Sequence, residues 1–176
     1  NMASKIVDIV GAFRLPILNE PVFAELPDGF IKDKTKVIQI NNAINGLKQA
    51  AYYWYNKISL ILKQLGFKPL ISEPCIFIDD SNNIIAVYVD DIHVAASNQN
   101  KLDQIINELQ KQLPCQFKDQ STYLGIHFTI ENNQILFDQK DKIMELLEIY
   151  QMKECKNIYT PAEPNSKLFK NEEDNN

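Results

Sequence analysis

The sequence predicts an α+β fold in which helices pack on one face of an antiparallel sheet. Short apolar segments are separated by polar turns, as in strands that are joined by hairpins. Longer segments carry apolar residues at intervals of three and four, as in amphipathic helices. Neighbouring strand segments often follow each other without a helix between them, and this order favours antiparallel pairing.

The first half of the chain contains one strand, one irregular region and one helix. Residues 5–10 are β-branched and apolar except for Lys5 and Asp8, so we expect a strand covered on both faces. Prolines in residues 14–35 predict an irregular or edge-strand region. Residues 47–65 have the apolar spacing of a helix, and Gly66 is the expected end of that helix.

The second half of the chain predicts two hairpins and two helices. Strands are expected at residues 75–79, 84–89 and 92–96, and an amphipathic helix at 99–113. A further hairpin is expected from strands at 122–130 and 134–137. A last helix is expected at 139–150, with Asp138 as its N-cap and with a buried face formed by Ile143, Leu146, Leu147 and Tyr150.

Composition limits the classes of function. The chain has 176 residues, enough for one domain with a core, and no apolar run of the roughly 18 residues that a membrane span needs. The net charge of −5 argues against strong nonspecific binding to nucleic acid, which depends on lysine and arginine. Three widely spaced cysteines predict reduced thiols rather than a zinc site or disulfides, with Cys75 buried as a small apolar residue.

Two pairs of adjacent aspartates follow apolar strands, and we interpret them differently. Asp79 and Asp80 fit a solvated turn, where aspartate is common. Asp90 and Asp91 lie between two apolar strands, and Asp8 interrupts a third. Three carboxylates brought together repel each other, and Mg²⁺ removes that conflict because it prefers carboxylate and phosphate oxygens. We therefore hypothesise a two-metal site in which Asp8 and Asp90 bridge the ions and Asp91 is a supporting acid.

The order and spacing of several motifs resemble the reverse transcriptase domain of copia-type (Pseudoviridae) retrotransposons. Residues 8–14 read DIVGAFR, where the family has the form DVKGAFL, and residues 22–30 read VFAELPDGF against VYMEQPPGF. Residues 43–55, AINGLKQAAYYWY, are similar to ALYGLKQAPRAWY. Shorter matches are LGF at 65–67, EPCIF at 73–77, YVDD at 88–91, YLGI at 123–126 and TP at 160–161. The resemblance covers residues 6–162.

The resemblance implies a reverse-transcriptase palm, and with it an RNA-directed DNA polymerase that transfers nucleotides from dNTP to a primer 3′-hydroxyl. Asp8, Asp90 and Asp91 would be both catalytic and metal-binding, with Mg²⁺ as cofactor and Mn²⁺ as a substitute. The other implied site residues are Phe13, Gln49 and Tyr88 for nucleotide binding, and Tyr123, Leu124 and Gly125 for the primer grip. Phe13 as a core aromatic, Gln49 as a solvated glutamine and Tyr88 as a buried strand tyrosine remain open alternatives, and Trp54 is expected in the core.

The resemblance also predicts the organisation and partners of the chain. Residues 5–138 would be the palm subdomain and 139–162 the start of the thumb or connection, with 1–4 a cloning remnant and 163–176 a disordered tail. Expected partners are an RNA/DNA template–primer, dNTP and the rest of a polyprotein with fingers and RNase H, without a membrane. The acidic chain alone is expected to bind nucleic acid weakly. The expected location is the cytoplasm, in a virus-like particle, or the nucleus. The alternative is a truncated or domesticated palm that no longer polymerises and serves as a binding or assembly module.

Overall fold

The computed structural model describes residues 2–27, 29, 35–117, 122–131, 134–156 and 158–159. The chain divides into two compact units, Asn1–Leu124 and Gly125–Asn176. This division falls before residue 138, where the sequence analysis ends the palm subdomain. The predicted tail at 163–176 lies outside the described residues. Among the described residues, no helix is both long and apolar enough to cross a membrane.

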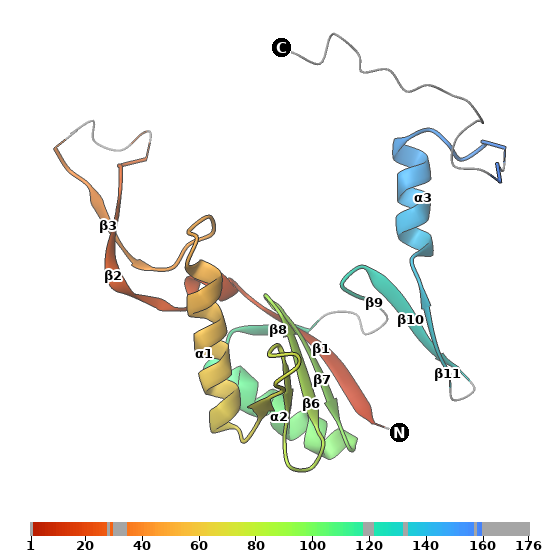
Figure 1. Ribbon diagram of the computed structural model, residues 1–176, viewed down its shortest axis with the longest axis horizontal. Helices are drawn as coiled ribbons and strands as arrows, with labels where there is room; N and C mark the ends of the chain where they lie inside the picture. The colour runs from red at the N-terminus through yellow and green to blue at the C-terminus, as the bar shows by residue number, and fades with distance from the viewer. Residues whose placement is uncertain are drawn as a thin grey trace, which may run out of the picture. The chain divides into compact units, whose positions relative to one another are not determined.

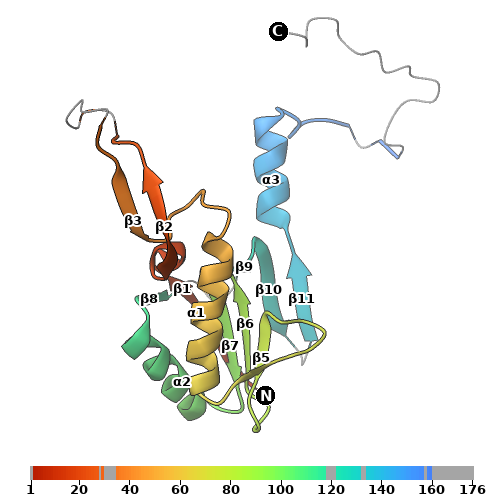
Figure 2. The same ribbon diagram turned by 60° about the vertical axis from the view of Figure 1, so that its left-hand side comes forward.

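The first unit is built on an antiparallel sheet (Figure 1, Figure 2) with the strand order β4-β5-β6-β7-β1-β8. Its strands are β1 (Ala3–Ile9), β4 (Lys68–Pro69), β5 (Ile76–Ile78), β6 (Ile84–Tyr88), β7 (Asp91–Ala96) and β8 (Cys115–Phe117). The first strand of the chain thus lies between β7 and β8 and pairs antiparallel with both. The predicted mixed fold with antiparallel sheets is confirmed.

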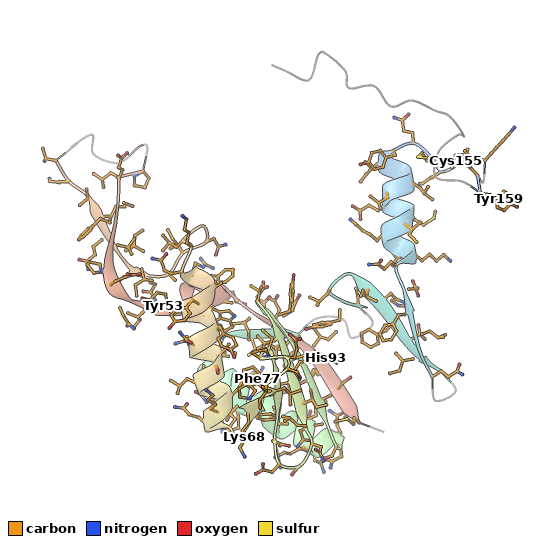
Figure 3. The ribbon with its side chains drawn as sticks, viewed as in Figure 1. Tyr53, Lys68, Phe77, His93, Cys155 and Tyr159 are labelled. Atoms are coloured by element: carbon orange, nitrogen blue, oxygen red, sulfur yellow. The ribbon has the colours of Figure 1, made fainter. Side chains whose placement is uncertain are left out.

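Two helices, α1 (Ala50–Gln64) and α2 (Gln99–Gln112), pack on one face of this sheet. Side chains alternate between the faces of a strand, so Val7 and Ile9 join the helix-side core while Asp8 between them does not. Phe77, labelled in Figure 3, is fully buried in the same core. Helix α2 begins where the Asn98 side chain accepts a hydrogen bond from the Lys101 N–H at 3.0 Å. The expected end of α1 at Gly66 is confirmed by its φ of +91°.

A short helix and a two-stranded ribbon occupy the region that the prolines marked as irregular. The helix η1 (Ala12–Arg14) follows β1, and β2 (Ile17–Ala24) pairs antiparallel with β3 (Ile38–Asn42). The ladder changes register between Ile17 and Val22, on either side of Pro21. A ribbon of two strands tolerates proline because each strand has a free edge. The edge-strand prediction is therefore confirmed for β2, whereas β3 was not predicted.

The second unit contains a hairpin and one helix. Strands β10 (Ile126–Glu131) and β11 (Gln134–Asp138) pair antiparallel, which confirms the predicted hairpin. Helix α3 (Lys140–Ile149) has Gln139 at its N-cap position, and the Asp138 carboxylate instead accepts from the Lys140 N–H at 3.1 Å. The predicted buried face of α3 is wrong, since none of the helix residues is buried. Helical spacing identifies an apolar face, but burial also requires a surface that covers it. The affected residues are Ile143, Leu146, Leu147 and Tyr150.

Three short strands were not predicted, namely β3, β4 and β8, and the strand predicted at 122–130 is divided into β9 (Thr122–Tyr123) and β10. Such segments are too short to show a period of two, and neighbouring strands rather than their own propensity place them in a ladder. The expected burial of Cys75 is also wrong, because Cys75 is exposed just before β5 begins. In the structure Cys75, Cys115 and Cys155 are free cysteines.

Candidate active site

The register of the sheet places four polar side chains in one row. Asp8 in β1 lies opposite Asp91 in β7 and opposite Gln116 in β8. Asp91 in turn lies opposite Tyr88 in β6. Residues directly opposite in an antiparallel pair share a face, with Cβ atoms about 4.5–5.5 Å apart. Because Val7, Ile9 and Ile92 face the helices, this row lies on the helix-free face.

The third predicted aspartate, Asp90, lies in the turn that joins β6 to β7. Its side chain is exposed, while its backbone carbonyl accepts a hydrogen bond from the Ile9 N–H at 2.8 Å. The preceding carbonyl, that of Val89, accepts from Nε1 of Trp54 at 2.6 Å. The turn is therefore bound to β1 and to α1. Trp54 is 3% exposed, which confirms its predicted place in the core, but its hydrogen bond to the turn was not foreseen.

His93 and Tyr123 lie beside the aspartate row. His93, labelled in Figure 3, is two residues beyond Asp91 in β7 and therefore on the same face of the strand. Its ring centroid is 5.3 Å from that of Tyr123. Burial lowers the pKa of His93 below its usual value, so the imidazole is neutral at pH 7. Burial raises the pKa of the Tyr123 phenol, and the negative charges of Asp91 and Cys75 raise it further. The structure thus brings Tyr123 close to Asp91. The sequence had assigned no role to His93.

Phe13 and Gln49 lie around the start of helix α1. Phe13 is half-buried in η1 and packs against both apolar clusters of the first unit. The Gln49 side chain donates a hydrogen bond to the Glu20 carboxylate in β2 at 3.1 Å. Sequence reasoning missed Glu20, because one exposed acid in a ribbon has no distinguishing pattern. The packing of Phe13 is what the core-aromatic interpretation expects.

Leu124 and Gly125, the remaining predicted primer-grip residues, form a turn with positive φ at both positions. Their φ angles are +52° and +75°. Positive φ is uncommon for a residue such as leucine, whereas glycine adopts it readily. Leu124 is the last residue of the first unit and Gly125 the first residue of the second. The backbone shape of the predicted segment is thus a tight turn.

The donor groups in this row can be compared with what Mg²⁺ requires. In the part of the chain that the structure describes, no three His, Cys, Asp or Glu residues are grouped so that they could hold a metal ion. The register pairs Asp8 with Asp91, whereas the sequence analysis paired Asp8 with Asp90 as bridging ligands. Mg²⁺ usually keeps several waters and takes one or two carboxylates together with substrate phosphates. The opposed carboxylates of Asp8 and Asp91 fit that type of site.

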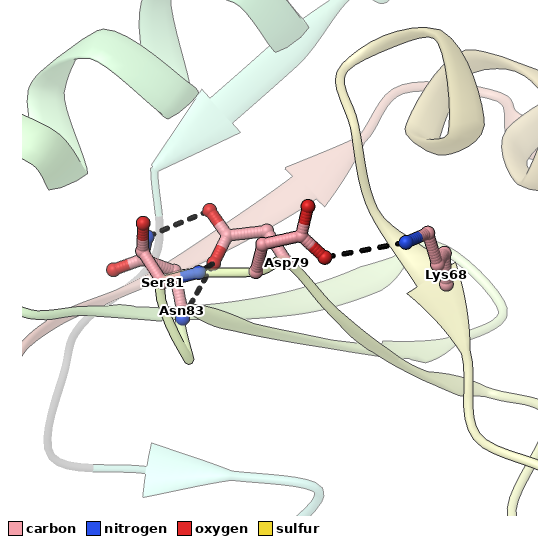
Figure 4. Close-up of polar contacts among 5 residues, drawn as sticks. Lys68, Asp79, Ser81 and Asn83 are labelled. Atoms are coloured by element: carbon pink, nitrogen blue, oxygen red, sulfur yellow. Dashed lines mark hydrogen bonds and ion pairs between the residues drawn. The ribbon is translucent and has the colours of Figure 1, made fainter.

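The other aspartate pair has local partners (Figure 4). Asp79 accepts hydrogen bonds from the N–H groups of Ser81 and Asn83, both at 2.9 Å, and from Nδ2 of Asn83 at 2.7 Å. Although burial alone raises it, these hydrogen bonds lower the pKa of Asp79 below its ordinary value. Asp80 forms an exposed ion pair with Lys68 at 3.2 Å. The interpretation of this pair as a turn is confirmed.

Comparison with known proteins adds evidence to this geometry. Residues 2–164 match the family described as reverse transcriptase (RNA-dependent DNA polymerase). The chain is 29% identical over 175 residues to the Retrovirus-related Pol polyprotein from transposon TNT 1-94 of Nicotiana tabacum, an alignment that covers 93% of this chain and 13% of that protein. It is 32% identical over 110 residues to the Putative transposon Ty5-1 protein of Saccharomyces cerevisiae, covering 60% of this chain and 36% of that protein.

A third relative is the Transposon Ty1-MR1 Gag-Pol polyprotein of Saccharomyces cerevisiae, which is 29% identical over 107 residues. That alignment covers 60% of this chain and 6% of the polyprotein. The chain therefore spans well under half the length of each of these relatives.

Proposed function

We propose that this chain, which belongs to the reverse transcriptase (RNA-dependent DNA polymerase) family of copia-type retrotransposons, forms the palm of such a polymerase. By ancestry the chain is an RNA-directed DNA polymerase. The observation that carries the proposal is the register of β1 and β7, which sets Asp8 directly opposite Asp91. Asp90 adjoins this pair in the turn, where the Ile9 N–H holds its carbonyl. The register thus brings two carboxylates from distant segments, Asp8 and Asp91, to one end of the sheet.

The arrangement of the aspartates suits a divalent cation. Carboxylates directly opposite each other on neighbouring strands repel, and a cation between them removes that repulsion. Asp8, Asp90 and Asp91 would hold Mg²⁺, with Mn²⁺ as a substitute. A bound ion would stabilise charge on the reacting phosphate and favour deprotonation of the primer 3′-hydroxyl. The sheet contributes rigidity, because Asp8 and Asp91 lie within paired strands rather than in loops.

The neighbouring residues would bind the substrates. Tyr88 is 59% exposed beside Asp91, so its ring is available to pack against the primer end. Phe13 and Gln49 would contact the incoming dNTP, and Gln49 would exchange the Glu20 carboxylate for the nucleotide. The primer grip would be formed by Tyr123, Leu124 and Gly125. The effect of Asp91 on the pKa of Tyr123 supports this placement for Tyr123.

The partners of the proposed palm would be an RNA/DNA template–primer and the other parts of a polyprotein. The net charge of −5 leaves little positive charge for phosphate contacts, so the chain alone would bind nucleic acid weakly. Fingers and RNase H domains would supply the remaining substrate contacts. Reverse transcription would take place in a cytoplasmic virus-like particle or in the nucleus.

RNA-templated primer extension tests the proposal. The chain is incubated with a labelled DNA primer on an RNA template, dNTPs and Mg²⁺, and the products are resolved by length. At template–primer concentrations high enough to offset weak binding, the wild type should extend the primer, and Asp91→Asn should reduce the rate by roughly 10²–10³-fold, the scale on which loss of one electrostatic contact to a transition state acts. Asp8→Asn should have the same effect.

Asp80→Asn is the matched control, because it makes the same change of charge outside the proposed site. Among the described ion pairs, Asp80 takes part only in the one with Lys68. It should extend the primer at the wild-type rate. Equal rates for Asp91→Asn and Asp80→Asn would contradict the assigned roles. A wild type that binds the template–primer without extending it would instead support the binding or assembly module.

A further inference from the structure

The turn that carries Asp90 is bound by a residue of the opposite layer of the fold. Trp54 belongs to helix α1, and its indole N–H donates to the Val89 carbonyl at 2.6 Å. The ring is 3% exposed and packs in the core between α1 and the sheet. A residue that only fills the core would not need a donor group aimed at this turn. Among the aromatic side chains, tryptophan combines a large apolar body with an N–H that only donates.

The turn itself has a strained backbone. Tyr88 and Asp91 are paired, so Val89 and Asp90 are the two central residues of the hairpin. Val89 has a φ of +54°. Hairpin turns need positive φ at the first central position, and glycine, asparagine or aspartate usually supply it. A β-branched residue adopts this conformation only when surrounding contacts impose it.

Two hydrogen bonds fix the orientation of Asp90. The Val89 carbonyl belongs to the peptide group before the Asp90 Cα, and Trp54 holds it. The Asp90 carbonyl belongs to the peptide group after that Cα, and the Ile9 N–H holds it at 2.8 Å. Peptide groups are planar, so fixing both planes fixes φ and ψ of Asp90 and the direction of its Cα–Cβ bond. The second of these peptide groups is also the one that joins Asp90 to Asp91.

We propose that Trp54 is a positioning residue, whose indole N–H holds the strained turn in the conformation that presents Asp90 and Asp91 to a divalent cation. The cation in this inference rests on the proposed function. The hydrogen bond between Trp54 and Val89 can be tested separately. Phenylalanine at position 54 would fill most of the same volume but would leave the Val89 carbonyl without this donor. The turn would then relax away from positive φ.

The test uses the single tryptophan of the chain, which gives one indole N–H signal in a ¹H–¹⁵N spectrum. In the wild type this proton should exchange slowly with solvent. Trp54→Phe should weaken Mn²⁺ binding, measured by water-proton relaxation, by roughly fivefold, which corresponds to the loss of one hydrogen bond. Adding Val89→Gly should restore affinity to within about twofold, because glycine keeps positive φ without strain.

Ile58→Val is the control for simple loss of core packing. Ile58 is fully buried on the same helix and belongs to the same apolar cluster. This variant should lower the unfolding midpoint without changing Mn²⁺ affinity. A purely structural role for Trp54 predicts that Trp54→Phe behaves like Ile58→Val and that Val89→Gly rescues nothing. Either result would overturn the inference, as would fast exchange of the indole proton.

Failure of the proposed function has a different outcome. If the wild type binds no Mn²⁺, the polymerase proposal fails, and the amide signals of Asp90 and Asp91 then decide the positioning role. These signals should shift in Trp54→Phe and return toward the wild-type positions in the double variant with Val89→Gly. Signals that stay unchanged in Trp54→Phe would overturn the inference whatever the metal result.

Discussion

Two neighbouring hairpins of the same sheet each contain a pair of aspartates, and the surroundings of the two pairs differ. At the β5–β6 connection, Asp79 accepts its hydrogen bonds from Ser81 and Asn83, within four residues along the chain. At the β6–β7 connection, the hydrogen bonds to the turn come from Ile9 and Trp54, which are distant in sequence. The first turn is thus built locally, and the second depends on the tertiary fold.

The two turns also use their acidic side chains differently. In the first turn, the carboxylate of Asp79 is an acceptor for backbone and side-chain N–H groups, so it stabilises the turn. In the second turn, the backbone carbonyls carry the hydrogen bonds, and the Asp91 carboxylate lies opposite that of Asp8. The first carboxylate therefore has a structural role in its turn, whereas the opposed carboxylates of the second hairpin belong to the cation site that we propose.

Among the binding and stability measurements that compare the two turns, the largest expected difference is in cation affinity. Asp91→Asn should weaken Mn²⁺ binding about tenfold or more, equivalent to ~1.4 kcal/mol, because it removes one of two opposed carboxylates. Asp80→Asn should leave the affinity unchanged, although it alters the net charge equally. Titration of each variant with Mn²⁺ by water-proton relaxation measures the difference. Equal loss in both variants would mean that only overall charge matters.

Substitutions should affect stability in the reverse order, with the larger loss of unfolding free energy at the first turn. Asp79→Ala should lower the free energy of unfolding by about 1–2 kcal/mol, because three N–H groups lose their acceptor. Asp90→Ala should change it by less than about 0.5 kcal/mol, since the Asp90 side chain is exposed. Urea denaturation followed by circular dichroism measures both values. A larger loss for Asp90→Ala would reverse the assignment of the two turns.

The stabilisation from Asp79 should depend on pH. Its pKa in the folded chain lies below the ordinary value of 3.8, so the unfolded chain binds a proton more readily. The contribution is therefore fully present above pH 3.8 and is lost as the pH falls through the lower folded value. The difference in unfolding free energy between the wild type and Asp79→Asn should shrink in that window. A difference that stays constant down to pH 2 would contradict this origin.

The smallest effect is expected at the ion pair of the first turn. Lys68→Ala should change the free energy of unfolding by about 0.5 kcal/mol or less, because both partners are largely exposed. Added salt should remove even this difference, since solvent-exposed charges are screened. Denaturation at low and high ionic strength makes the comparison. A salt-independent loss would show that Lys68 contributes packing instead of charge.

Local signals in the sequence predicted much of the fold. The apolar spacing predicted α1 and α2, and the central strands β1, β6 and β7 were found from their β-branched runs. The short strands β3, β4 and β8 were missed because tertiary pairing, rather than their own sequence, forms them. The buried face of α3 was predicted wrongly because periodicity does not reveal whether a covering surface exists.

The candidate site was predictable only in its parts. The sequence singled out Asp8, Asp90 and Asp91, but it could not supply the register that sets Asp8 opposite Asp91. It placed Trp54 in the core without its hydrogen bond to the Val89 carbonyl. Such contacts join segments far apart in the chain, so no local pattern encodes them.

One spectrum compares the two turns most directly. Amide signals of the ¹⁵N-labelled chain are followed while Mn²⁺ is added in small amounts, since the bound paramagnetic ion broadens signals near it. Broadening should begin at residues 88–93 and at Asp8 in β1, while the signals of residues 79–83 stay sharp. Equal broadening at both turns, or broadening that starts at 79–83, would contradict the claim that the second aspartate pair, together with Asp8, forms the cation site.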